Sequence, residues 1–199
     1  MNTDIPIFSV AALIKQGAFA YYRRRKTKRH VVTQNMIRGD RFAKALTDRN
    51  RGRHECGGVV VIDGVGLSFR IDAYIAPHFV EIKWVNPLYH TAPTLLRKAL
   101  VQVSAYNRLL DMADRITDLA GEEVMPDPSW KTMLYFDSKM YEVDGSDEVI
   151  DFLVAKAKAI HSGDINAMLD VDTTLTVTTM PIPYRLSEHR LKETVAWTV

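Results

Sequence analysis

The chain has 199 residues, of which 25% are charged, and this composition fits one soluble globular domain over residues 1–199 with its core at about 8–180. A net charge of +2 excludes a strong whole-molecule attraction for nucleic acid, so any such binding must come from local patches. The single Cys56, the lack of a long apolar run and the lack of a signal-like N-terminus exclude a disulfide framework and predict a cytoplasmic protein without a membrane span, in the host cytoplasm if it is viral.

The first half of the chain predicts two helices and then three short strands. Ser9 is a suitable N-cap for a helix over residues 10–25, and a second helix is expected over 33–48. A charged connector follows at 51–55. The strands are expected over 59–62, 69–75 and 79–85, with Asp63-Gly64 as the turn of the first hairpin, so that the three form an antiparallel meander.

The end of the first helix is strongly basic, and two interpretations of it are open. One is a solvated helix end whose cations favour the C-terminal dipole. The other is contact with a phosphate backbone, because Arg and Lys supply the sequence-independent part of nucleic-acid binding. The candidate residues for backbone contacts are Arg23, Arg24, Arg25 and Lys26, together with Arg97 and Lys98 further along the chain.

The second half predicts a long helix, two strands, a helix and a tail. The long helix is expected over 93–119, because Pro93 suits the first helical turn and Gly121 ends the pattern. Ser146 caps the later helix. The remaining elements are expected as strands over 132–136, 139–143 and 175–180, with that helix over 146–161 and a short helix after Ser187. This order indicates an α/β (α+β) fold with one mixed central sheet flanked by helices.

Three charged residues alternate along the second and third predicted strands. Asp72 lies on one strand, and Glu81 and Lys83 share one face of the next. If Ala76-Pro77 is a two-residue turn, Asp72 stands directly opposite Glu81, and all three side chains meet. A three-residue loop without a bulge would instead split them across the sheet.

Two carboxylates and a lysine on one patch suit metal-dependent chemistry on a phosphate. Mg²⁺ takes one or two carboxylates and keeps several waters, so Asp72 and Glu81 are candidate ligands, with the carbonyl of Ile82 as a further oxygen. Lys83 could orient a water or neutralise developing charge. The alternative is a solvated strand face with a cross-strand ion pair. Gln102 and Tyr106 are four residues apart on the long helix and therefore share a face, which is also compatible with an ordinary helix surface.

The ordered set Gly66, Arg70-Ile71-Asp72, Glu81-Ile82-Lys83, Gln102 and Tyr106 resembles the PD-(D/E)xK nucleases. It is most similar to their RecB-like branch, which includes the CRISPR-associated adaptation nucleases and nucleases of archaeal viruses. The resemblance covers roughly residues 8–110 and implies a restriction-endonuclease-like core. It implies Asp72 and Glu81 as metal ligands with the Ile82 carbonyl, Lys83 as the catalytic lysine, and Gln102 and Tyr106 as residues that shape the site or hold DNA.

Two departures from that family pattern bear on cofactors. The histidine that often ligates metal on the second helix is replaced by Ala43, and Asp40 is a candidate substitute ligand. Many CRISPR-associated relatives hold an iron–sulfur cluster with four cysteines. One cysteine cannot support such a cluster, so the expected cofactor is Mg²⁺ or Mn²⁺ alone.

The resulting expectation is a Mg²⁺- or Mn²⁺-dependent deoxyribonuclease with little sequence specificity, acting on single strands or DNA ends as exonuclease, endonuclease or both. Its partner would be DNA, and assembly into a homo-oligomer is compatible with the resemblance. One alternative is a catalytically weak or inactive nucleic-acid-binding protein on the same fold. Another is a structural protein in which the charged strand face is only an ion-pair patch.

Overall fold

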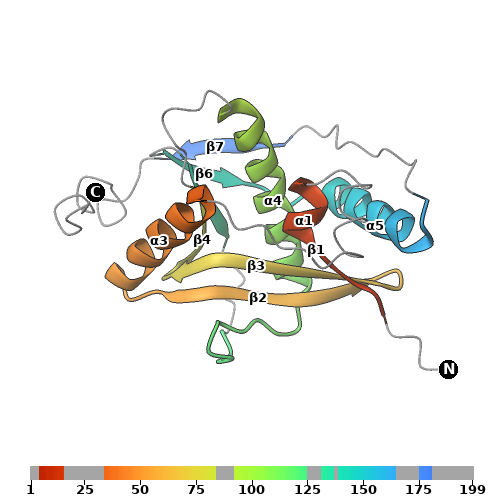
Figure 1. The fold of residues 1–199 in the computed structure, drawn as a ribbon, viewed down its shortest axis with the longest axis horizontal. Coiled ribbons are helices and arrows are strands. Elements are labelled where there is room, and N and C mark those ends of the chain that lie inside the picture. Colours follow the sequence, from red (N-terminus) through yellow and green to blue (C-terminus); the bar gives the residue numbers. More distant parts are fainter. Residues whose placement is uncertain are drawn as a thin grey trace.

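The computed structural model describes residues 5–15, 34–83, 92–124, 131–136, 139–164 and 175–180. Within these ranges, seven strands form one open mixed sheet with four helices packed around it (Figure 1). The elements are β1 Ile7–Ser9, α1 Val10–Lys15, α3 Gln34–Arg49, β2 Arg53–Ile62, β3 Val65–Ile75, β4 His78–Lys83, α4 Ala92–Met112, β5 Thr132–Phe136, β6 Lys139–Val143, α5 Asp147–Ser162 and β7 Val177–Met180.

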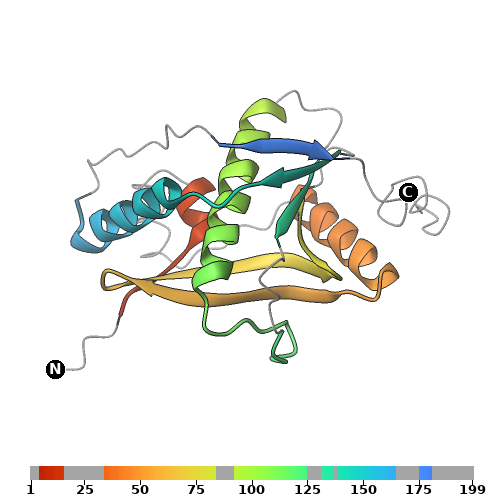
Figure 2. The ribbon, with the colours of Figure 1, turned by 180° about the vertical axis from the view of Figure 1, so that it is seen from behind.

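The sheet runs in the order β1-β3-β4-β5-β6-β7, and β2 pairs with β3 as well. The pairs β1–β3 and β4–β5 are parallel, and the other pairs are antiparallel. This arrangement confirms the predicted mixed sheet and its β2–β3–β4 meander. Figures 1 and 2 show β2 and β3 as a long hairpin that extends well beyond β4.

Local sequence signals fix several element ends as expected. Asp63 and Gly64 have φ angles of 50° and 80°, so both central residues of the β2–β3 turn are left-handed. Asp-Gly tolerates that conformation well, which is why the pair favours a two-residue hairpin turn. The Ser146 side chain accepts a hydrogen bond from the backbone N–H of Val149, and Gly163 ends α5 with a φ of 85°.

The structure differs from the predictions at two strands. Residues 53–58, expected partly as a connector, belong to β2, because β3 is long enough to pair with them. Polar groups there are compatible with a strand that exposes one face, where Arg70 pairs with Glu55. Strand β1 was not predicted, since three residues are too short to show a period.

The long helix is also shorter than predicted. It ends at Met112, and residues 113–124 turn back along β2 instead of continuing the helix. Ile116 is buried in the core, and Thr117 exchanges backbone hydrogen bonds with Gly57. Tertiary pairing therefore overrides local helical preference here. The predicted continuations at 16–25 and 84–85 and the helix after Ser187 lie outside the described residues.

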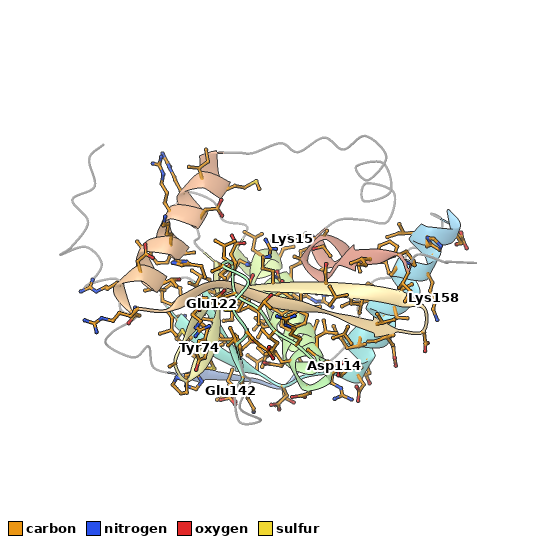
Figure 3. All side chains as sticks on the ribbon, turned by 90° about the horizontal axis from the view of Figure 1, so that it is seen from below. Lys15, Tyr74, Asp114, Glu122, Glu142 and Lys158 are labelled. Atoms are coloured by element: carbon orange, nitrogen blue, oxygen red, sulfur yellow. The ribbon has the colours of Figure 1, made fainter. Side chains whose placement is uncertain are left out.

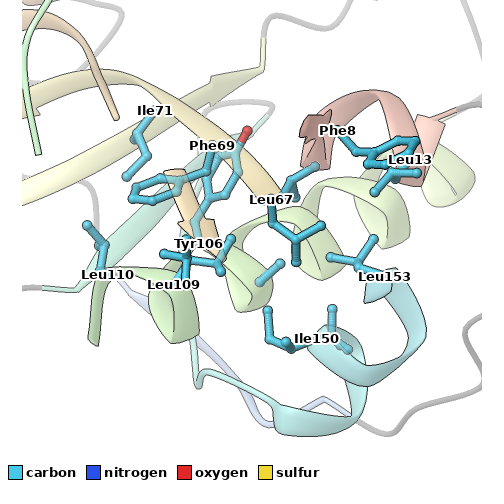
Figure 4. Close-up of a cluster of buried hydrophobic side chains, with 14 of the residues drawn as sticks. Phe8, Leu13, Leu67, Phe69, Ile71, Tyr106, Leu109, Leu110, Ile150 and Leu153 are labelled. Carbon is cyan, nitrogen blue, oxygen red and sulfur yellow. The ribbon is translucent and has the colours of Figure 1, made fainter. Parts of the chain in front are cut away.

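Apolar packing covers both faces of the sheet. Helix α3 places Phe42 and Leu46 against a cluster on β3, β4, β5 and β6. A larger cluster joins β1, β2 and β3 with α1, α4 and α5, and Figure 4 shows its central side chains, including Phe69, Tyr106 and Leu153. Among the described helices, none combines the length and the apolar character needed to cross a membrane.

Candidate active site

The predicted site residues lie where β3 lacks a neighbouring strand on one side. On one side, β3 pairs with β2 over residues 65–74. On the other side it pairs with β1 at residues 66–68 and with β4 at residues 73–75, so residues 69–72 lie between the two ladders. No strand of the described chain fills that interval. Polar groups in the interval therefore need other partners than a sheet ladder.

Asp72 occupies the end of this gap that adjoins β4. Ile75 pairs with His78 across a two-residue turn, and the register continues to Ala73 and Val80. One step further, Asp72 stands opposite Glu81, as the two-residue turn predicted. The strands separate at this point, and the Asp72 Oδ2 accepts a hydrogen bond of 2.8 Å from the Ile82 backbone N–H.

Glu81 is the most buried acid of the site, with 1% of its surface exposed. Its Oε1 accepts hydrogen bonds from the Lys83 ammonium and, at 2.7 Å, from Gln102 Nε2. Its Oε2 is buried and has no hydrogen-bond partner among the described residues. The Lys83 Nζ also lies 3.8 Å from the Asp72 Oδ2, so one ammonium bridges both carboxylates.

Gln102 and Tyr106 of α4 complete the cluster from above the sheet. Both side chains are buried, and Gln102 Nε2 donates to the Tyr106 hydroxyl at 2.7 Å as well as to Glu81. The two residues share a helix face, as their spacing predicted. The alternative of an ordinary helix surface is wrong, because α4 turns this face towards β4.

Burial and neighbouring charges shift the pKa values of Glu81, Lys83 and Tyr106. Burial and then the Asp72 charge raise the pKa of Glu81 to about 7, although Lys83 acts in the opposite direction. Burial by itself would lower the pKa of Lys83, but the charges of Glu81 and then Asp72 outweigh it and raise that pKa. Burial and then Glu81 raise the pKa of Tyr106 well above its usual value. Lys83 and Tyr106 are therefore both protonated at neutral pH.

Lys15 is a residue of this neighbourhood that sequence reasoning missed. It is the last residue of α1, and Figure 3 labels its side chain there. Loss of solvation and then the positive charge of Lys83 lower the pKa of its ammonium, while Glu81 and Asp72 act in the opposite direction. It therefore lies within electrostatic range of all three site charges. No local signal marks it, because only the packing of α1 brings it near β3 and β4.

Asp40, the predicted substitute ligand, lies apart from the acidic pair, as do Ala43 and His54. Asp40 is exposed on α3, which packs on the opposite face of β3 and β4, and the described residues contain no group of three or more His, Cys, Asp or Glu side chains that could hold a metal ion. Asp40 therefore does not form such a group with Asp72 and Glu81. Ala43 packs against the apolar cluster on that same face. His54 instead lies 2.7 Å from Asp48.

The predicted nucleic-acid contacts are only partly described. Arg97 and Lys98 are exposed on the first turns of α4. The Lys98 ammonium lies 3.5 Å from the Lys15 carbonyl oxygen, which places these two lysines at the same end of α1. The basic run Arg23, Arg24, Arg25 and Lys26 lies outside the described residues.

A polar cavity of about 440 Å³ adjoins the cluster. Tyr106 lines it and also belongs to the acidic site, and Arg70 lines it two residues before Asp72 on the same strand face. Ser9 and Ser68 contribute hydroxyl groups to its wall, and Thr117 closes it from the segment after α4. The cavity therefore extends the site along β3 towards β1.

The donor set fits a hard divalent cation. Such an ion takes oxygen ligands, and Mg²⁺ is commonly held by one or two carboxylates with waters in the remaining positions. Asp72 and Glu81 supply two carboxylates, and the unpaired Glu81 Oε2 is a buried acceptor without a donor among the described residues. Ile82, whose carbonyl is the third predicted ligand, directly follows Glu81 in β4. Two carboxylates alone would suit an ion that keeps several waters rather than one held in an all-protein cage.

No protein-family model and no curated protein sequence matches this chain. Among solved structures, the crystal structure of SSO0001 is similar, with a TM-score of 0.53 and 15% sequence identity, covering 81% of this chain and 78% of that one. At this identity the likeness supports the mixed α/β fold and carries no information on activity.

Proposed function

We propose that this protein is a Mg²⁺- or Mn²⁺-dependent nuclease that hydrolyses phosphodiester bonds in DNA. The observation that carries the proposal is the buried Glu81, whose Oε2 has no partner in the described chain, opposite Asp72 and bonded to Lys83. A buried carboxylate with an unsatisfied oxygen costs stability. Such a cost is common where a group is kept for binding or catalysis.

In this proposal Asp72, Glu81 and the carbonyl of Ile82 hold the ion. A divalent cation bound there would lower the pKa of a water molecule that it coordinates. It would also neutralise charge on the scissile phosphate. The raised pKa of Lys83 favours a role as a hydrogen-bond donor to a phosphate oxygen or to the attacking water, not as a base. Gln102 fixes the orientation of Glu81, and Tyr106 fixes that of Gln102.

The DNA strand would approach along the cationic side of the cluster. Lys15, Arg97 and Lys98 supply positive charge for phosphate contacts, which carry no sequence information. The polar cavity lined by Arg70 and Tyr106 could receive a nucleotide next to the cleaved bond. We therefore propose cleavage with little sequence specificity on single strands or DNA ends, by an enzyme that acts in the cytoplasm.

The second candidate function is DNA binding without cleavage. The observation that favours it is that Asp72 and Glu81 have no third acidic, histidine or cysteine ligand in the described chain, while Ala43 stands at the family's histidine position. Such a protein would bind DNA in a salt-dependent manner and cut nothing with either metal.

The test is a cleavage assay on labelled single-stranded and duplex DNA, linear and circular, with Mg²⁺, Mn²⁺ or chelator. Wild type is compared with Asp72→Asn, Glu81→Gln and Asp40→Asn. Asp151→Asn is the matched control, because Asp151 is an exposed acid on α5. We expect metal-dependent cutting that Asp72→Asn and Glu81→Gln abolish and that Asp40→Asn and Asp151→Asn retain. If the Asp72→Asn and Glu81→Gln variants still cut DNA, the proposed site is wrong. Binding without cutting supports the second candidate.

A further inference from the structure

The cavity beside the acidic pair lies on the face of the hairpin that also carries Asp72. Ser68, Arg70 and Asp72 share one face of β3, because side chains alternate along a strand. Ser68 and Arg70 line the cavity, and so does Ser9, which is the register partner of Ser68 in β1. The cavity therefore begins next to the proposed metal ligand Asp72 and follows the same face towards β1.

Hydroxyl groups of the cavity wall have donor capacity that the described chain does not use. The Tyr106 hydroxyl accepts a hydrogen bond from Gln102 Nε2, and no described residue accepts its own proton, although the side chain is only 1% exposed. The Ser9 hydroxyl accepts from the Ala12 N–H at 3.4 Å, and its proton has no described acceptor either. Donors left over in the wall of a cavity suit a ligand with acceptor oxygens.

Arg70 has the largest unused donor capacity in the wall. A guanidinium carries five N–H donors in a planar fork that matches the oxygens of a phosphate. In the described part of the chain only its Nη1 has a partner, the Glu55 Oε2 at 2.9 Å. The two side chains are 68% and 44% exposed, and exposed ion pairs contribute little to stability. A phosphate oxygen can therefore replace Glu55 at little cost.

The backbone of Glu55 is strained at this same place. The β2–β3 register on either side of it puts Glu55 opposite Asp72. Its φ angle is 50°, which lies in the left-handed region that residues other than glycine rarely adopt. Strain of this kind collects at functional sites. The strained residue is the one that holds Arg70, so its conformation is tied to the position of that guanidinium.

The remaining charge of the wall is already balanced. Asp118 Oδ2 lies 3.4 Å from Arg53 Nη1, and Asp118 Oδ1 accepts from the backbone N–H groups of Ala120 and Glu122. Arg70 is the only cation among the described residues that line the cavity. The interior thus suits an uncharged polar group, and its volume of about 440 Å³ is within the range of small-molecule sites.

We propose that this cavity binds one unpaired nucleotide of the DNA strand next to the cleaved bond. The nucleoside occupies the cavity, the scissile phosphate lies at Asp72, and the neighbouring phosphate binds Arg70. These two residues are about 6.6 Å apart along the strand, which is comparable with the spacing of adjacent phosphates in an extended DNA strand. A base that is paired within a duplex cannot enter unless it leaves the stack.

Glu55 is a positioning residue in this arrangement. It holds the Arg70 guanidinium at the cavity until a phosphate takes its place. The inference rests on the proposed nuclease function, because the metal site sets where the scissile phosphate lies.

The experiment measures the binding of thymidine 3′,5′-bisphosphate by calorimetry in the presence of Mg²⁺. This probe carries two phosphates and no phosphodiester bond, so the proposed reaction cannot cleave it. Thymidine and its 5′- and 3′-monophosphates are the comparison ligands, and they identify which phosphate lies at Arg70. The full chain is tested as wild type, Arg70→Gln and Glu55→Gln. Circular dichroism establishes that each variant is folded.

Arg115→Gln and Glu123→Gln are the matched controls. Arg115 and Glu123 form an exposed pair of the same residue types at 3.7 Å, and neither lines the cavity. Each control therefore removes the same charge as its counterpart without touching the proposed subsite.

We expect the bisphosphate to bind more tightly than either monophosphate, and thymidine to bind most weakly. Arg70→Gln should weaken bisphosphate binding about tenfold or more, as expected for the loss of a charged hydrogen bond. Glu55→Gln should instead strengthen it by about two- to fivefold, because it removes the charge that competes for Arg70. The two controls should leave it unchanged. A purely structural role of the pair would weaken binding in both variants, and that outcome overturns the inference, as does an equal loss in Arg115→Gln.

DNA cleavage by the same proteins separates this inference from the proposed function. A wild type that cuts DNA but binds the bisphosphate no better than thymidine overturns the subsite and leaves the nuclease proposal intact. A wild type that cuts nothing but binds the bisphosphate through Arg70 supports the subsite and contradicts cleavage. Equal cutting of single strands and of duplex circles would overturn the requirement for an unpaired nucleotide.

Discussion

The two faces of the β3–β4 pair have opposite characters, although residues of the two faces alternate along the same two strands. Towards α3, Ala73, Ile75, Val80 and Ile82 form a dry apolar cluster. Towards α4, Asp72 and Glu81 stand opposite each other with Lys83 between them. Burial of apolar side chains on the first face stabilises the folded state, whereas burial of charged side chains on the second face destabilises it. The difference indicates that the polar face is retained for a function other than stability.

The largest expected effect is a loss of cleavage activity on substitution of the polar face but not of the apolar face. Removing the ammonium in Lys83→Met should lower the cleavage rate by about 10²–10⁴-fold, the usual contribution of one donor or proton-transfer group. The apolar-face variant Ile75→Ala should keep its activity per folded molecule. Single-turnover cleavage under saturating metal measures both. Equal losses in the two variants would mean that the faces are not functionally distinct.

The next prediction concerns the stability that the apolar face contributes. Ile75 is 2% exposed between β3 and α3, so Ile75→Ala should leave a cavity and lower the free energy of unfolding by about 2–5 kcal/mol. Urea denaturation of wild type and variant measures this change. The control is Val177→Ala, whose side chain is exposed on β7 and which should change stability by less than about 0.5 kcal/mol. A small loss at Ile75 would contradict the assignment of stability to this face.

The pH dependence of stability tests the buried acid. The pKa of Glu81 is about 7 in the folded chain and 4.5 in its ordinary state, so between these values the folded chain binds the proton more tightly. Stability should therefore fall as pH rises from about 4.5 to 7, by at most about 3–4 kcal/mol in chelator, because one pKa unit corresponds to about 1.4 kcal/mol. Glu81→Gln should flatten this part of the profile. An unchanged slope would show that Glu81 is not the titrating group.

The smallest effect concerns the cation from α1. Lys15→Gln should raise the KM for DNA by about three- to tenfold with little change in kcat, and should reduce the slope of log binding against log salt by about 0.7–0.9, as expected for one lost phosphate contact. Lys158→Gln is the control, because Lys158 is an exposed lysine that pairs with Asp63 on the β2–β3 turn. An effect confined to kcat would instead place Lys15 at the reacting phosphate.

Sequence by itself determined the features that depend on short-range rules. The two-residue turn at Ala76-Pro77 and the period of two along a strand put Asp72 opposite Glu81 and on the same side as Lys83. The Asp63-Gly64 turn and the Ser146 cap follow equally from local backbone preference. The mixed sheet follows from the order of the elements.

Tertiary structure alone decided what surrounds those residues. Because β1 and β4 share one side of β3, a gap opens at residues 69–72, and nothing in a local period reports it. Long-range packing placed α4 over the acidic pair and α3 on the other face, which buried Glu81, brought Gln102 to it and left Asp40 apart. The same packing brought Lys15 to the site. These outcomes depend on contacts between residues far apart in the chain, and hydrophobic periodicity encodes only which side of an element is buried, not what covers it.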